Sequence, residues 1–188
     1  ITATDSISVD GAISNASGCT IKANGAISAT GNITNNAGAT ISAKTNMSCA
    51  TLNNLAGSAG TQSSPQATTV TVGGNLTASG DLNNTSGTAG YNDPTVQVNG
   101  NLTVTGTVNN NASSGVASWS FINVGGTTSC GTLNQYERAY FAANNTVTIG
   151  TLNNGNYCEL VTTGTITINS SCTNSANALI KADGNVTV

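Results

Sequence analysis

The chain has 188 residues, enough for one domain, and 37% of them are hydrophobic, which is enough to form a core. Only 6% are charged, and a net charge of −3 with four basic side chains leaves no basic patch for nucleic acid. No apolar run reaches the roughly 20 residues of a membrane span, histidine is absent, and the five cysteines form no CxxC pair, so we expect no membrane span, metal or cofactor.

Short alternating strands, punctuated by Gly and closed by an apolar residue and Asn, recur along the chain. Residues 70–84 and 96–110 match almost position for position, and looser copies cover 21–35, 41–54, 122–134, 147–154, 163–169 and 180–188. Aligned on the closing apolar residue, the copies form one column: Ile13, Ile33, Leu52, Leu82, Val108, Leu133, Leu152 and Ile168. This pattern predicts an all-β, single-domain right-handed parallel β-helix (β-solenoid) over residues 1–188, with about eight coils and a closing fragment.

Asparagine follows the apolar column in five successive coils, at Asn53, Asn83, Asn109, Asn134 and Asn153. Asn tolerates the left-handed backbone of a sharp corner, and stacked Asn side chains can hydrogen-bond along the stack. We therefore predict a structural Asn ladder at a corner of the solenoid, with no chemical role.

Coil spacings longer than 20 residues indicate insertions that leave the solenoid at one edge, near residues 55–69, 85–95, 111–120 and 135–145. All the aromatic residues lie between 91 and 157, and five form a possible contact surface: Tyr91, Trp119, Tyr136, Tyr140 and Phe141. These rings could form a satellite core beneath the loops, or a surface for a neighbouring subunit or a glycan. Within the last insertion, residues 135–142 are the one place where helix could form.

The cysteines fall into two groups. Cys49 and Cys130 each precede the apolar column by three positions, but two coils separate them, which is too far for a bridge. Cys158 and Cys172 fall in adjacent coils in this alignment, so they are the predicted disulfide.

The sequence offers few residues from which a catalytic site could be formed. The carboxylates do not recur at one coil position, histidine is absent, and there is a single arginine. A hydrolytic site needs clustered acids, and a nucleophilic cysteine needs an imidazole partner. We expect no enzymatic activity.

Residues 31–43, continued by 47–54, resemble the repeats of filamentous haemagglutinin-like bacterial adhesins in their apolar, Gly and Asn positions. The resemblance implies a right-handed β-helix that is exported and adheres without catalysis. Its departures are the five cysteines, the insertions, the small number of coils and the lack of a recognisable secretion domain. We expect an extracellular, cell-surface protein in mature or excised form, since no signal segment opens the chain at Ile1.

Three roles remain open at this level. The small size and the lack of evident caps favour a filament subunit that assembles head to tail with itself, or an adhesin for glycans or for host or abiotic surfaces. Thr-x-Thr pairs suggest an ice-binding solenoid, but they fall at several coil positions instead of one. A carbohydrate-binding module would use the aromatic corner loops.

Overall fold

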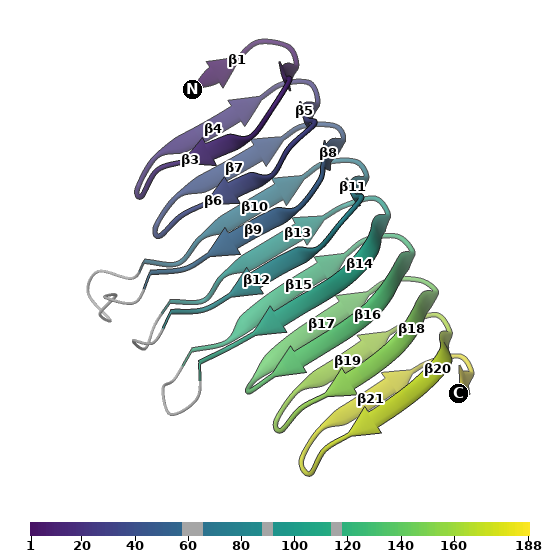
Figure 1. Cartoon of the computed structure of the whole chain (residues 1–188). Helices are drawn as coiled ribbons and strands as arrows, with labels where there is room; N and C mark the ends of the chain where they lie inside the picture. The colour runs from purple at the N-terminus through teal and green to yellow at the C-terminus, as the bar shows by residue number, and fades with distance from the viewer. Residues whose placement is uncertain (58–65, 88–91, 114–117) are drawn as a thin grey trace.

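The computed structural model describes residues 1–57, 66–87, 92–113 and 118–188. All regular secondary structure in these ranges is β-strand, arranged in a nine-stranded and a thirteen-stranded sheet, called here sheet A and sheet B. Every strand pair is parallel, and the coils stack along one axis with the two ends of the chain at opposite ends of the stack (Figure 1). The predicted parallel β-solenoid is confirmed. None of the described residues forms an apolar helix long enough to cross a membrane.

Sheet A receives one strand from each coil. Its strands, in spatial order, are β1 (Thr2–Ala3), β4 (Thr20–Ala23), β7 (Thr40–Ala43), β10 (Thr69–Val72), β13 (Thr95–Val98), β15 (Ser120–Val124), β17 (Ala139–Ala143), β19 (Glu159–Thr162) and β21 (Leu179–Ala182). The nine strands correspond to eight complete coils and a partial ninth, as the repeat predicts.

Sheet B receives two strand segments from each complete coil, which are separate at the start of the chain and fused later. The first segments are β2 (Ile7–Val9), β5 (Ile27–Ala29), β8 (Met47–Cys49) and β11 (Leu76–Ala78), and the second are β3 (Ile13–Asn15), β6 (Ile33–Asn35), β9 (Leu52–Leu55) and β12 (Leu82–Thr85). In the next four coils the two segments are joined in one strand: β14 (Leu102–Asn111), β16 (Thr128–Tyr136), β18 (Val147–Asn154) and β20 (Ile166–Asn174). The partial ninth coil contributes β22 (Val186–Thr187).

The core lies between the sheets, because alternate residues of each strand point inward. The predicted apolar column is in register from Ile13 to Leu152 and is buried throughout. Its last member was predicted wrongly, since Leu152 pairs with Cys172, whereas Ile168 pairs with Ile149 in a neighbouring column. The register also shifts by one residue between Ile149 and Thr151. The prediction failed because Ile168-Asn169 has the apolar-Asn form of the repeat ending, whereas the true column member, Cys172, is followed by Thr173.

Glycines mark the bend between the two segments of sheet B. A Cβ atom on Gly131 would lie 2.8 Å from the carbonyl oxygens of Thr105 and Gly106, and one on Gly150 would lie 2.3 Å from that of Gly131. Backbones of successive coils approach so closely there that a side chain would have to displace one of them.

Three of the four predicted insertions fall between a strand of sheet B and the next strand of sheet A, between β9 and β10, β12 and β13, and β14 and β15, and part of each lies outside the described residues (Figure 1). The fourth, at residues 135–145, is not an insertion and holds no helix. β16 runs to Tyr136, Glu137 and Arg138 form a tight turn with φ of 44° and 48°, and β17 begins at Ala139. The segment is an ordinary coil corner, and its polar and aromatic composition led to its prediction as an insertion.

Candidate functional site

The five asparagines predicted to form a ladder do so on the outer surface of sheet B. Four of them donate Nδ2 to the Oδ1 of the preceding coil, at 2.8 Å from Asn83 to Asn53, 2.8 Å from Asn109 to Asn83, 2.9 Å from Asn134 to Asn109 and 2.8 Å from Asn153 to Asn134, and Asn53 donates to the Thr34 hydroxyl at 3.4 Å. The amides therefore satisfy one another from coil to coil, in the structural role that was predicted.

This outer ladder does not lie at a corner. Its members are within β9, β12, β14, β16 and β18, in extended backbone. Besides Glu137 and Arg138, the left-handed corner positions are four residues, Gly18, Gly38, Tyr157 and Asn177, with φ between 57° and 71°. Each is the third residue of a four-residue turn closed by a backbone hydrogen bond, as from Cys158 N to Gly155 O.

A second amide ladder, which the sequence analysis did not predict, lies one residue further along the same strands and is buried from Asn15 to Asn154, whereas Asn174 is exposed. It comprises Asn15, Asn35, Asn54, Asn84, Asn110, Gln135, Asn154 and Asn174, and here each side-chain amide donates to the following coil. The distances are 2.8 to 3.0 Å, except 3.4 Å from Asn110 to Gln135. The signal was the Asn-Asn pair that ends four of the repeats, at 53–54, 83–84, 109–110 and 153–154, because strand alternation turns its second member inward.

The inner ladder also joins the two sheets. The Nδ2 of Asn84 donates to the backbone oxygens of Pro94 at 3.2 Å and Phe121 at 3.0 Å, where the chain enters sheet A. Asn35 makes the equivalent bonds to Ala39 and Thr69. The Pro94 and Ala39 oxygens also accept backbone hydrogen bonds from Phe121 and Thr69, so each amide adds a second donor to carbonyl groups at a buried corner.

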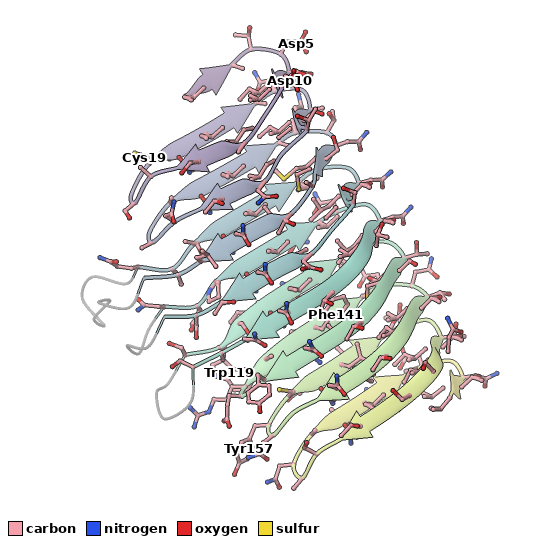
Figure 2. The ribbon with its side chains drawn as sticks, viewed as in Figure 1. Asp5, Asp10, Cys19, Trp119, Phe141 and Tyr157 are labelled. Atoms are coloured by element: carbon pink, nitrogen blue, oxygen red, sulfur yellow. The ribbon has the colours of Figure 1, made fainter. Side chains whose placement is uncertain are left out.

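The predicted aromatic surface is only partly assembled. Trp119 stacks on Phe121 with ring centroids 6.3 Å apart, and Phe121 meets Tyr140 at 6.2 Å, forming a half-buried row on the outer face of sheet A. Phe141 was predicted wrongly as a contact residue: it is fully buried in the core, because alternation in β17 turns it inward (Figure 2). Tyr136 is 66% exposed at the end of β16, and Tyr91 lies outside the described residues.

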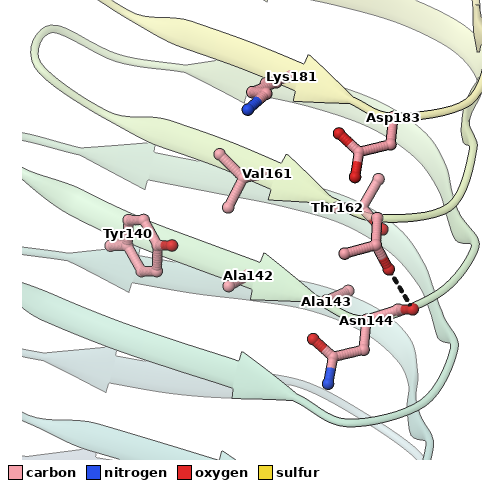
Figure 3. A pocket seen from close by; sticks show the side chains of 9 residues that line it. Tyr140, Ala142, Ala143, Asn144, Val161, Thr162, Lys181 and Asp183 are labelled. Atoms are coloured by element: carbon pink, nitrogen blue, oxygen red, sulfur yellow. Dashed lines mark hydrogen bonds between the residues drawn. The ribbon is translucent and has the colours of Figure 1, made fainter.

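A shallow groove continues from this aromatic row across the last coils of sheet A (Figure 3). Its volume is about 320 Å³; Tyr140 lies at one side, Ala142 and Val161 line the floor, and Lys181 and Asp183 lie toward the last coil. Thr163 donates a hydrogen bond to the Asn144 carbonyl at its rim. Rings, aliphatic surface and two opposite charges can bind a polar ligand with apolar faces, such as a sugar.

Three of the carboxylates bind the next coil. The Oδ1 of Asp81 accepts from Thr107 N at 2.8 Å, that of Asp93 accepts from Trp119 N at 2.7 Å, and that of Asp10 accepts from the Thr30 hydroxyl at 3.0 Å. Among the described residues, no group of three or more Cys, Asp or Glu side chains is arranged to hold a metal.

All five cysteines are free, so the predicted Cys158–Cys172 disulfide is wrong. The misaligned last coil placed these residues in adjacent coils, whereas Cys172 continues the Leu152 column of sheet B and Cys158 precedes β19 of sheet A. Cys49 and Cys130 are buried in one column with Ala78 and Val104 between them. Burial raises the pKa of Cys49 to about 11 and that of Cys130 to about 12, which suppresses thiolate chemistry at both.

The chain matches no protein-family model, no curated protein and no solved structure at the level taken as significant.

Proposed function

We propose that the chain is a non-catalytic, extracellular structural protein whose coils stack end to end into a surface filament or an adhesive rod. The observation that carries this proposal is the continuity of its hydrogen-bonded columns. The inner amide ladder has one sense from Asn15 to Asn174, so its first end offers an amide oxygen and its last end an amide donor. Two stacked copies would extend the ladder without a reversal.

The outermost strands of the chain also support stacking. β1 is paired in the sheet only with β4, and β21 only with β19. Apolar side chains there are exposed, with Ile1 at 79%, Leu179 at 43% and Val186 at 47%. Unpaired strand edges bind other strands readily, and a chain with few charges offers little repulsion. The contact is heterologous, so it propagates as a filament unless the rotation closes a ring.

Assembly of the 188-residue chain tests the proposal. Sedimentation velocity over a concentration series and negative-stain microscopy should detect linear polymers. A charged, proline-containing extension before Ile1 should abolish them and leave the far-UV β-sheet signal intact, whereas a Gly-Ser extension of equal length should weaken assembly much less. A native chain that stays monomeric at the highest concentration contradicts end-to-end stacking.

The aromatic row supports a second candidate function, the binding of glycans. Trp119, Phe121 and Tyr140 form a row of half-buried rings, and Tyr140 also lines the groove. Rings of this kind pack against the apolar faces of sugars. Trp119 is the sole tryptophan, so its fluorescence reports on this surface directly. Hits on a glycan array that Tyr140→Ala removes, with a matching Trp119 emission shift, would support this role. An array without hits would contradict it.

A further inference from the structure

One outward column on sheet B carries a hydroxyl group in every coil. It runs along the first strand segments and comprises Ser8, Ser28, Ser48, Thr77, Thr103, Ser129, Thr148, Thr167 and Thr187, each in register with the next. Neighbouring members are one strand spacing apart, about 4.8 Å. The column therefore extends through all nine coils without a single interruption by another residue type.

The fold does not require hydroxyl groups at such a position. The equivalent outward column of sheet A mixes hydroxyl, amide, aliphatic and basic side chains: Thr2, Lys22, Ser42, Thr71, Gln97, Asn123, Ala142, Val161 and Lys181. Both columns have the same parallel pairing and the same outward direction. The uniformity of the sheet B column thus comes from something other than the solenoid backbone.

The hydroxyl groups are also largely free to bind something else. In the two amide ladders nearly every neighbouring pair is hydrogen-bonded, and this accounts for their composition. In the hydroxyl column, which lies wholly within the described residues, the one bond between members runs from Ser48 to Ser28 at 3.0 Å. The others direct a donor and an acceptor away from the protein.

The second outward column of this face is uncharged as well, although Asp10 lies at the bend between the two columns and accepts a hydrogen bond from the Thr30 hydroxyl at 3.0 Å. The outward column of the second segments consists of Ser14, Thr34, the five asparagines of the outer ladder and Thr173. β14, β16, β18 and β20 run through both segments, so the two columns share one continuous surface in those coils. Asp81, at the bend between them, accepts a hydrogen bond from Thr107 N in the next coil.

We propose that this outer face of sheet B, defined by the hydroxyl column and the outer amide ladder, binds the surface of ice. Ice is an uncharged lattice of water molecules, each a donor and an acceptor, and the spacing of molecules along its prism faces is close to the strand repeat. An array of hydroxyl groups fixed at that repeat can take lattice positions without being reordered, which lowers the entropic cost of binding. Charged side chains would hold their own hydration shells and disturb the match.

The Thr-x-Thr pairs do not make this array. Thr103, Thr148 and Thr167 each contribute one hydroxyl to the column, but their sequence partners precede them in some coils and follow in others. Thr69 and Thr71 lie on sheet A. The hydroxyl groups therefore form a regular array only when the coils are stacked, with one group from each coil.

The test compares lysine pairs on the two faces. Thr103→Lys with Ser129→Lys places two charges on adjacent strands of the hydroxyl column, and Gln97→Lys with Asn123→Lys does the same on sheet A. Thermal hysteresis and inhibition of ice recrystallisation should fall at least fivefold for the first pair and less than twofold for the second. Circular dichroism and the melting temperature verify that both variants remain folded.

Two outcomes would overturn the inference. One is a native chain that neither shapes ice crystals nor produces thermal hysteresis. The other is equal loss from both lysine pairs. Co-sedimentation with microcrystalline cellulose or chitin, lost only in the sheet B pair and without activity on ice, would overturn it in favour of a crystalline polysaccharide. These measurements use dilute monomer and do not depend on filament assembly.

Discussion

Asparagine has two different roles at adjacent positions of the same strands. Asn83 lies half-exposed in the outer ladder, where water can replace either of its bonds. Asn84 is fully buried, accepts from Asn54 at 2.8 Å and donates to Asn110 and to two backbone oxygens. A buried polar group without its partner costs more than a lost bond at the surface.

Substituting the two residues separately should expose this difference. We expect Asn84→Ala to lower the free energy of unfolding by about 3 kcal/mol or more, because several buried groups lose their partner. Asn83→Ala should cost about 1 kcal/mol or less. Urea unfolding followed by circular dichroism measures both values. Equal losses of unfolding free energy would mean that the buried ladder contributes no more to stability than the exposed one.

The buried thiols make stability depend on alkaline pH. Cys49 and Cys130 have folded-state pKa values of about 11 and about 12, raised by burial from 9.0. A raised folded pKa means that the stabilisation is complete below pH 9 and is lost as pH rises toward 11 or 12, because the unfolded thiols ionise first.

Replacing both thiols by Ala, the residue found in their column at Ala78, should flatten this dependence. Between pH 9 and 11 the native chain should lose about 2 kcal/mol more than the double variant for each thiol removed. Unfolding at a series of pH values in urea provides the comparison, and parallel curves for the two proteins would contradict it.

Within each strand, the alternating direction of the side chains determines which residues are buried. In β14, Val108 is fully buried in the column between Leu82 and Leu133, whereas Thr105 of the same strand is exposed. Val108→Asp should prevent cooperative folding of the central coils, since a charge would enter a dry core without a partner. Thr105→Asp should change the unfolding free energy by about 0.5 kcal/mol or less.

Thermal melting of the two β14 variants tests this assignment. The Val108 variant should lose its cooperative transition or melt far below the native chain, and the Thr105 variant should melt close to it. Similar melting curves would place the inward frame of β14 elsewhere.

Sequence patterns predicted those parts of the fold that recur at nearly constant spacing. The apolar column could be read from Ile13 to Leu152 because every coil repeats an apolar residue at this position, followed by Asn in five of them. It failed at Ile168, because Ile168-Asn169 has the form of the repeat ending, whereas the true column member, Cys172, is followed by Thr173. The hydroxyl column escaped detection because Ser and Thr alternate irregularly along it, and it emerges only when coils of unequal length are stacked.

For the whole molecule, burial is greatest in the middle of the stack and declines toward both ends. Val70, Val96, Leu133 and Leu152 are fully buried, whereas Ile7 in β2 is only half-buried and both residues of β22 are exposed. Because each coil is stabilised chiefly by its neighbours, the outermost coils should open most easily.

Hydrogen exchange on the native chain should therefore proceed first in β1 and in β21 to β22, and last in β10 to β18. Raising the concentration until polymers form should then slow exchange at the two ends while the central strands change little, because stacking pairs the open edges of β1 and β21. Mass spectrometry of peptides from both ends measures this. Protection gained along the outer face of sheet B, with the ends unchanged, would show lateral association instead and contradict end-to-end stacking.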